Sequence, residues 1–177
     1  MTRLSPLSLP DMTAVQREVH DRIAAGPRGG VRGPLALWLH RPELAEKAQQ
    51  LGRYCRYDSC LPPRLSELAI LTTARIWDAG YEWQAHVSPA RAAGLSEEVI
   101  GALAADKTPP FGHIDEQLVY EFTRELNLTR SVGDELFGRT VAELGKDATV
   151  DLVGILGYYS LVSMTIKAFE VPAPDSG

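Results

Sequence analysis

Apolar residues recur every three or four positions along most of this 177-residue chain. The first such stripe consists of Met12, Val15, Val19 and Ile23. It predicts an amphipathic helix that Asp11 caps and that runs through Ala25. Because no segment shows the strict alternation of a half-buried strand, the pattern predicts an all-α protein with about eight helices.

Proline, glycine and capping residues divide the rest of the chain into further helices. We expect an extended arm over residues 1–10, a loop over 26–34 and a frayed tail over 171–177. Helical segments are predicted over residues 34–40, 42–57, 62–78, 81–93, 96–105, 115–127, 131–144 and 148–169. The last is the most apolar segment of the chain, so it is expected in the core or in a subunit interface.

Composition and charge narrow the class of protein. The length suits one well-buried core, so we expect a single domain over residues 1–177. With a net charge of −5 and a pI near 5.4, the chain lacks the basic face of a sequence-independent nucleic-acid binder. It also lacks an apolar run of about eighteen residues and an N-terminal signal-peptide stretch. We therefore expect a cytoplasmic protein with neither nucleic acid nor membrane as a partner.

Two cysteines raise the question of thiol chemistry. Cys55 and Cys60 are spaced C-x-x-x-x-C, which is neither the redox C-x-x-C motif nor a zinc motif. In the predicted helix over 42–57, Cys55 shares a face with Leu44, Ala48 and Leu51. We interpret both cysteines as small apolar residues, with a peroxide-reducing or regulatory thiol pair as the alternative.

The predicted helix over 62–78 places one carboxylate, Glu67, in an apolar run. Its neighbours are apolar on nearly every side, which is typical of a buried helix. A buried carboxyl group without a partner has a raised pKa and can donate or accept a proton near neutrality. The alternative is that Glu67 only complements the dipole at the start of the helix.

The next helix carries a second carboxylate and a histidine. Glu82 and His86 are four residues apart, so they lie on one helical face. A carboxylate there stabilises an imidazolium and orients the ring, as a general acid or base requires. An ordinary solvated pair is the alternative. Glu67, Glu82 and His86 could supply three metal ligands, but the spacing has no strong precedent, so no metal is predicted.

Four further residues are candidates for binding a substrate: Arg75, Trp83, Tyr81 and His40. Arg75 could hold a carboxylate, and Trp83 could wall an apolar pocket beside the imidazole. Tyr158 and Tyr159 are interpreted as packing residues. The glycine-rich loop over 26–34 is expected to be mobile or to face the substrate, rather than to be a phosphate loop, since no strand precedes it and no G-K-[ST] follows.

The stretch RLSELAILTTARIWDAGYEWQAHVSPARAAGLSEE resembles the carboxymuconolactone decarboxylase family. The elements ELAIL, YEW and H-x-x-x-A-x-x-x-G-L occur in the family's order, and the best match covers about residues 61–103. GPLALWLHRPELAEKAQQLG and GILGYYSLVSMTIKAFEVP extend the resemblance over most of the chain. This family shares its all-helical bundle fold with the alkylhydroperoxidase D-like proteins, so the resemblance implies that fold.

The resemblance also implies residue roles. The peroxidase branch of the superfamily uses a glutamate, a C-x-x-C pair and a histidine four residues beyond the second cysteine. Glu67 and His86 match the glutamate and the histidine, whereas Ala79 and Glu82 occupy the two cysteine positions. Because thiol–disulfide chemistry needs a thiolate, the motif lacks the group that peroxide reduction requires.

What the resemblance then implies is a decarboxylase without a cofactor. His86, poised by Glu82, would protonate the enolate left by loss of carbon dioxide from a small lactone or carboxylated product of aromatic breakdown. Glu67 would relay protons, and Arg75 would hold a carboxylate or oxyanion. The alternatives are a peroxide-reducing antioxidant protein and a non-catalytic binding protein. Members of this superfamily assemble as trimers or hexamers, so a homo-oligomer is expected.

Overall fold

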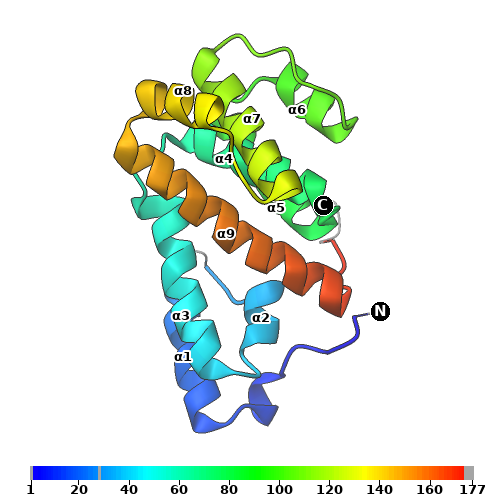
Figure 1. The fold of residues 1–177 in the computed structure, drawn as a ribbon. Helices are drawn as coiled ribbons and strands as arrows, with labels where there is room; N and C mark the ends of the chain where they lie inside the picture. The colour runs from blue at the N-terminus through cyan, green and yellow to red at the C-terminus, as the bar shows by residue number, and fades with distance from the viewer. Residues whose placement is uncertain (1, 28, 174–177) are drawn as a thin grey trace.

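The computed structural model describes residues 2–27 and 29–173, and these form a bundle of helices (Figure 1). The described residues contain nine α-helices and no strand, which confirms the predicted all-α fold. The α-helices are α1 (Ala14–Ala24), α2 (Pro34–Trp38), α3 (Pro42–Arg53), α4 (Pro63–Ile76), α5 (Gly80–Ala92), α6 (Glu97–Ala104), α7 (Ile114–Thr129), α8 (Asp134–Leu144) and α9 (Lys146–Phe169). A 3-10 turn, η1 (Leu9–Asp11), precedes α1, and a π-helical turn, η2 (Tyr54–Asp58), follows α3.

Helix α4 forms the centre of the core. All ten residues from Leu65 to Ala74 are buried, as expected for a helix that is apolar on nearly every side. It packs against α5, α7 and α9, so it is covered on several faces. Glu67 lies in this buried stretch with only 7% of its surface exposed. The fold therefore places a carboxyl group where water cannot solvate it freely.

The start of the first helix differs from the prediction. Asp11 ends the 3-10 turn η1, and Thr13 caps α1 instead. The Thr13 hydroxyl accepts from the Gln16 backbone N–H, while the Gln16 side chain accepts from the Thr13 N–H. This reciprocal pair satisfies two otherwise free donors, so it fixes the helix start two residues later than Asp11 would. Val15, assigned to the inner stripe, is 57% exposed.

The face predicted for α3 is only half correct. Cys55 and Ala48 are buried, whereas Leu44 and Leu51 are exposed. The buried side of α3 is made of small residues, Ala45, Ala48 and Gly52. Small side chains let neighbouring helices approach closely, so this face is buried although it carries less apolar surface than the leucines.

Helix α9 crosses the bundle diagonally (Figure 1). It has 24 residues. Among the described residues it is the one helix long and apolar enough to cross a membrane. The sequence pattern did not indicate such a helix. Half of its most apolar window is buried inside the bundle. Core helices of soluble proteins share this property, so it is weak evidence for a membrane span. The outer face exposes Val150, Val153, Leu161 and Met164.

The N-terminal arm lies against the end of α9. The Arg3 N–H donates to the Phe169 carbonyl at 2.8 Å, and the Arg3 guanidinium pairs with Glu170 at 2.6 Å. Part of the predicted tail, residues 174–177, lies outside the described residues, as does Met1 of the arm.

Candidate active site

Helices α4 and α5 bring the three predicted proton-transfer residues together. Between them the chain reverses at Asp78, which has a positive φ of 48°, and the Ala79 N–H donates to the Ala74 carbonyl at 2.8 Å. The two helices then pack against each other. Glu67 reaches across from α4, while Glu82 and His86 lie one turn apart on α5.

The imidazole of His86 lies between the two carboxylates. Its Nδ1 is 2.7 Å from Glu67 Oε2, and its Nε2 is 3.2 Å from Glu82 Oε2. All three side chains are buried, with His86 only 3% exposed. The solvated-pair interpretation of Glu82 and His86 is therefore wrong, and Glu67 is a partner of His86 rather than only a complement to the dipole of α4.

This geometry gives each nitrogen of the His86 ring a carboxylate oxygen within ion-pair distance. The contact with Glu67 is a hydrogen bond. Burial alone would lower the pKa of His86, but the hydrogen bonds and charges of Glu67 and Glu82 outweigh it and raise that pKa above 6.5. The cluster is thus a buried proton store.

A cavity of about 140 Å³ adjoins one side of this cluster. Glu82 and His86 form part of its wall, whereas Glu67 lies behind them and reaches the cavity only through the imidazole. The lining residues are Gly30, Arg32, Pro34, Leu35, Trp38, Arg56, Tyr81, Glu82, Ala85, His86, Tyr158, Tyr159 and Val162. They come from α2, η2, α5, α9 and the loop before α2, so the site exists only in the assembled fold.

Aromatic side chains from α9 and α2 form one wall of this cavity. The Tyr159 ring stands at 90° to the His86 ring, with 5.1 Å between their centroids. Tyr158 packs edge-on against Tyr159, and Trp38 packs against Tyr158. The Trp38 indole N–H donates to Thr165 Oγ1 at 3.0 Å, which anchors that ring. The imidazole therefore packs against an aromatic wall on its Tyr159 side.

The glycine-rich loop contributes to the wall of the cavity. Gly30 and Arg32 belong to the lining, while Arg28 of the same loop lies outside the described residues. Gly33 has a φ of 54°, and a Cβ added there would lie 2.4 Å from Tyr81 Cζ. Only glycine suits both the left-handed backbone and this close approach, so Gly33 fixes the loop against Tyr81.

Two guanidinium groups line the cavity, on Arg32 and Arg56. Among the described residues, neither forms an ion pair with a carboxylate within 4.0 Å. Arg56 lies over the Tyr57 ring, 5.5 Å from its centroid, which leaves its N–H donors available. The wall of this small cavity thus carries two positively charged side chains, Arg32 and Arg56, and also the Glu82–His86 pair of α5.

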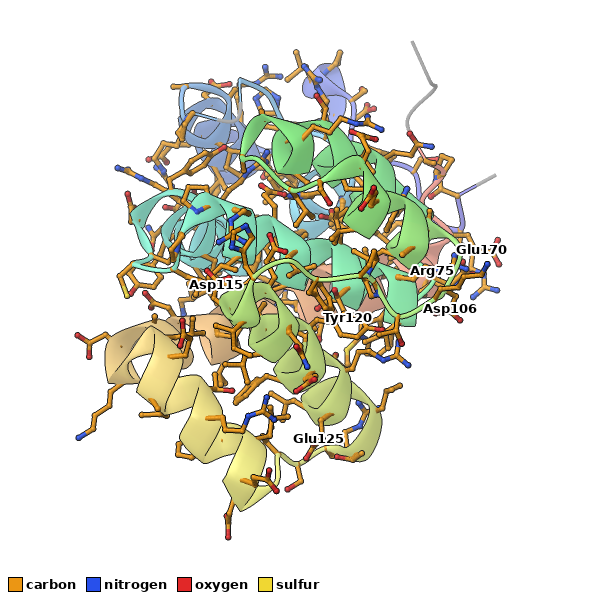
Figure 2. The ribbon with its side chains drawn as sticks, turned by 90° about the horizontal axis from the view of Figure 1, so that it is seen from above. Arg75, Asp106, Asp115, Tyr120, Glu125 and Glu170 are labelled. Carbon is orange, nitrogen blue, oxygen red and sulfur yellow. The ribbon has the colours of Figure 1, made fainter. Side chains whose placement is uncertain are left out.

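Arg75 and Trp83, predicted to bind the substrate, line a different cavity. This second cavity, of about 150 Å³, lies beside Ala104 and the turn at Asp78. Arg75 is eight residues beyond Glu67, which places it about 12 Å further along α4 and about 80° around the helix. Its side chain therefore lies away from the His86 cavity; Figure 2 shows it on the side of the bundle where Asp106 and Glu170 also lie.

The other two predicted binding residues also separate. Tyr81 lies in the wall of the His86 cavity, where burial raises the pKa of its phenol. His40 does not line this cavity. Its Nε2–H donates to the Ser5 carbonyl at 3.0 Å, so His40 anchors the N-terminal arm. The prediction for His40 is wrong because position 40 follows the end of α2, beyond the helical face that Trp38 presents to the cavity.

The two cysteines lie outside the cavity, and neither forms a disulfide. Cys55 is buried in the core, whereas Cys60 is exposed. A hydrogen bond to Asp151 and the negative charge of that carboxylate raise the pKa of the Cys60 thiol. The Asp151 carboxylate is itself held by the Tyr54 hydroxyl at 2.6 Å and the Cys60 N–H at 2.7 Å. The negative charge beside Cys60 disfavours the thiolate that redox chemistry needs.

Metal binding is not built into the cluster. Among the described residues, no group of three His, Cys, Asp or Glu side chains is arranged to hold an ion. Glu67 and Glu82 contact opposite nitrogens of the His86 ring, so the three groups do not converge on one point. The arrangement suits proton transfer along a line rather than coordination.

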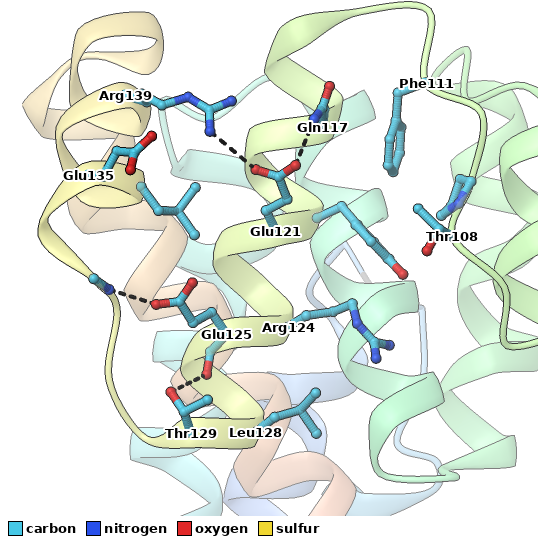
Figure 3. A pocket seen from close by; sticks show the side chains of 14 residues that line it. Thr108, Phe111, Gln117, Glu121, Arg124, Glu125, Leu128, Thr129, Glu135 and Arg139 are labelled. Atoms are coloured by element: carbon cyan, nitrogen blue, oxygen red, sulfur yellow. Dashed lines mark hydrogen bonds and ion pairs between the residues drawn. The ribbon is translucent and has the colours of Figure 1, made fainter.

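A larger hollow, of about 870 Å³, lies between α7, α8 and the loop before α7 (Figure 3). Three of its charged groups have partners: Arg139 lies 3.7 Å from Glu121, and the Gly133 N–H donates to Glu125 at 2.6 Å. Its lining contains neither histidine nor cysteine. By volume this hollow would be the first candidate for an active site. The small cavity is the better candidate, because of the two it is the one with a titratable cluster, Glu82 and His86, that is shielded from water.

The structure adds residues that the sequence did not indicate as parts of a site. Arg56, Trp38 and Tyr159 all line the cavity, and Tyr159 had been interpreted as a packing residue. They come from η2, α2 and α9, far from α5 in the sequence. No local spacing links them to His86, so only the packing of α9 and α2 beside α5 could identify them.

The arrangement of the helices is that of the AhpD-like fold. Residues 42–125 match the model of the carboxymuconolactone decarboxylase family, in agreement with the resemblance seen in the sequence. Among proteins of curated function, none matches the sequence significantly.

Two solved structures share the fold. One is the core of an alkylhydroperoxidase AhpD, an uncharacterized peroxidase-related protein from Ralstonia eutropha JMP134; it has a TM-score of 0.76 and 15% identity over 98% of this chain and 93% of that chain. The other is a protein of unknown function from Agrobacterium tumefaciens, described as an AhpD-type candidate for antioxidant defence. Its TM-score is 0.70, with 16% identity over 81% of this chain and 99% of that chain. At these identities the likeness establishes the fold and leaves the reaction open.

Proposed function

We propose that this protein is a decarboxylase that acts on a small lactone acid or a related carboxylated product of aromatic breakdown. The observation that carries the proposal is the buried His86, held between Glu67 and Glu82 at the wall of a small cavity. Such a cluster stores a proton out of contact with bulk water and presents it to a bound molecule. The match of residues 42–125 to the carboxymuconolactone decarboxylase family supports this class of reaction.

The reaction needs one bond to break and one proton to move. The bond between the carboxylate and the ring carbon breaks, carbon dioxide leaves, and the electron pair passes into the conjugated carbonyl group as an enolate. The enolate carbon then takes the proton shared by His86 and Glu82, which both line the cavity. Glu67 holds the other ring nitrogen and helps to return a proton from water to the cluster.

Arg56 takes the role that the sequence assigned to Arg75. Its guanidinium lines the cavity and has no carboxylate partner among the described residues, so it can hold a negative oxygen of the substrate. Arg32 contributes a second positive charge from the loop. The volume of about 140 Å³ restricts the substrate to a small molecule.

The proposal is tested by supplying lactone acids and related carboxylates and measuring release of carbon dioxide. His86→Ala should lose at least a hundredfold in turnover, the usual contribution of a positioned general acid (about 10²–10⁴). His40→Ala is the matched control, since His40 binds the arm outside the cavity. Equal rates for the unaltered protein and His86→Ala would remove His86 from the mechanism.

Peroxide reduction is the second candidate, because the structural relative from Ralstonia eutropha is described as peroxidase-related. In this chain the thiols lie away from the cavity, and Asp151 disfavours the Cys60 thiolate. Replacement of both Cys55 and Cys60 by alanine should leave any slow consumption of hydrogen peroxide unchanged. If the double variant loses peroxide consumption that the unaltered protein shows, thiol chemistry is the activity.

The exposed apolar face of α9 supports the expected homo-oligomer. Val150 is 71% exposed and Met164 is 49% exposed on the same outer side of this helix, with Gly154 and Gly157 between them. An apolar helix face of this kind suits a second copy of the chain. Light scattering should give a mass above 19.4 kDa for the unaltered protein, and Val150→Glu with Met164→Glu should lower it. A monomeric unaltered protein would refute the expectation.

A further inference from the structure

One polar group in the wall of the His86 cavity has no use in the mechanism so far. The Tyr159 hydroxyl is buried and has no hydrogen-bond partner among the described residues. A buried hydroxyl without a partner costs about 1–3 kcal/mol, so such groups are rare unless something else binds them. Tyr159 lines the His86 cavity, so a molecule bound there is the partner that can approach this hydroxyl.

The surroundings of Tyr159 define what that partner can be. Burial and the negative charge of Glu82 raise the pKa of the Tyr159 phenol well above 10, while the positive charge of Arg56 opposes the rise. The phenol is therefore protonated at neutral pH and acts as a hydrogen-bond donor. Arg56 has only donors as well. Two donors in one cavity wall call for an acceptor, and the nearby guanidinium favours one with negative charge.

We propose that the Tyr159 hydroxyl and the Arg56 guanidinium form a subsite for an oxyanion, which is the carbonyl oxygen of the substrate that becomes the enolate oxygen. The inference rests on the proposed decarboxylation and assigns a new binding residue to it. Tyr159 donates a hydrogen bond and keeps its proton, so the electron pair from the broken bond comes to rest on an oxygen held by two donors. The His86 ring, 5.1 Å from the Tyr159 ring, is then beside the enolate carbon.

The test uses binding, so that it does not depend on turnover. Paraconate, a saturated butyrolactone carboxylate, carries both acceptor groups but has no ring double bond to take up electrons. Its affinity is measured by calorimetry for the full-length protein, for Tyr159→Phe and for Ser163→Ala. Ser163 is the matched control, because its hydroxyl is also buried without a partner on α9 but does not line the cavity.

Tyr159→Phe should bind paraconate about tenfold more weakly, while its melting temperature stays equal to or above that of the unaltered protein. A ring without a hydroxyl keeps the contact with His86 and removes an unsatisfied polar group. Ser163→Ala should bind as the unaltered protein does. Equal affinity in Tyr159→Phe, a lower melting temperature of that variant, or no binding by the unaltered protein would overturn the subsite. The proposed function fails separately, through the absence of carbon dioxide release from every lactone acid.

Discussion

The His86 cavity and the hollow between α7 and α8 hold similar charged side chains in opposite environments. In the hollow, Glu121 and Arg139 are 34% and 45% exposed, so water screens their pairing. In the cavity, Glu82 and His86 are 8% and 3% exposed, and their contact is not screened. Charged groups therefore interact more weakly in the larger hollow than in the small cavity. Chemistry depends on shielding titratable groups from water, which the small cavity does and the large hollow does not.

The largest expected effect compares one glutamate from each place. Glu67→Gln removes the carboxylate that holds His86 Nδ1 at 2.7 Å, so the ring loses a charge partner and its fixed orientation. Turnover of the lactone acid should fall about a hundredfold. Glu121→Gln in the hollow should leave turnover within twofold. Steady-state kinetics of both variants measure this, and an equal loss in each would remove the distinction between the two places.

A second comparison uses two partly buried arginines. Arg56→Gln removes a donor from the His86 cavity, whereas Arg75→Gln alters the separate cavity beside Ala104. We expect KM for the lactone acid to rise about tenfold in the first variant, equivalent to about 1.4 kcal/mol, and to stay unchanged in the second. If Arg75→Gln gave the larger rise, the substrate would have to bind in the cavity beside Ala104.

The pH profile separates the two carboxylates that act on His86. Both raise the pKa of the imidazole, and Glu82 does so from the cavity side. A general acid loses activity as the pH rises through its pKa. In Glu82→Gln the pKa of His86 should be lower, so the alkaline limb of the rate profile should move to lower pH. A limb at the same pH in both proteins would mean that another group supplies the proton.

The smallest effect concerns stability. The folded protein raises the pKa of His86 above 6.5, so it binds the imidazole proton more tightly than the unfolded chain does. The resulting contribution to the free energy of unfolding is complete below about pH 6.5 and is lost as the pH rises through the folded-state pKa. Urea denaturation of the unaltered protein should show this loss, and His86→Gln should lack it. The difference between the two proteins isolates His86 from other groups that titrate.

Much of the fold could be predicted from local pattern. The spacing of apolar residues, the prolines at helix starts and the glycines at helix ends determine the all-α class and most helix bounds. Errors arose where a neighbouring cap decided the boundary, as Thr13 did against Asp11. They also arose where small residues formed the buried face, as Ala45 and Ala48 did instead of Leu44.

The residues of the candidate site also fall into two groups, those that local sequence pattern identifies and those that only the packing of helices identifies. The sequence by itself determined Glu67, Glu82 and His86 as candidates, since an isolated carboxylate in an apolar helix and an i,i+4 pair are local features. Only the tertiary structure decided that Arg56 and Tyr159 line the cavity with His86 and that Arg75 does not. The physical reason is that the direction of a side chain follows from its own helix, whereas what it meets depends on which helices pack beside it.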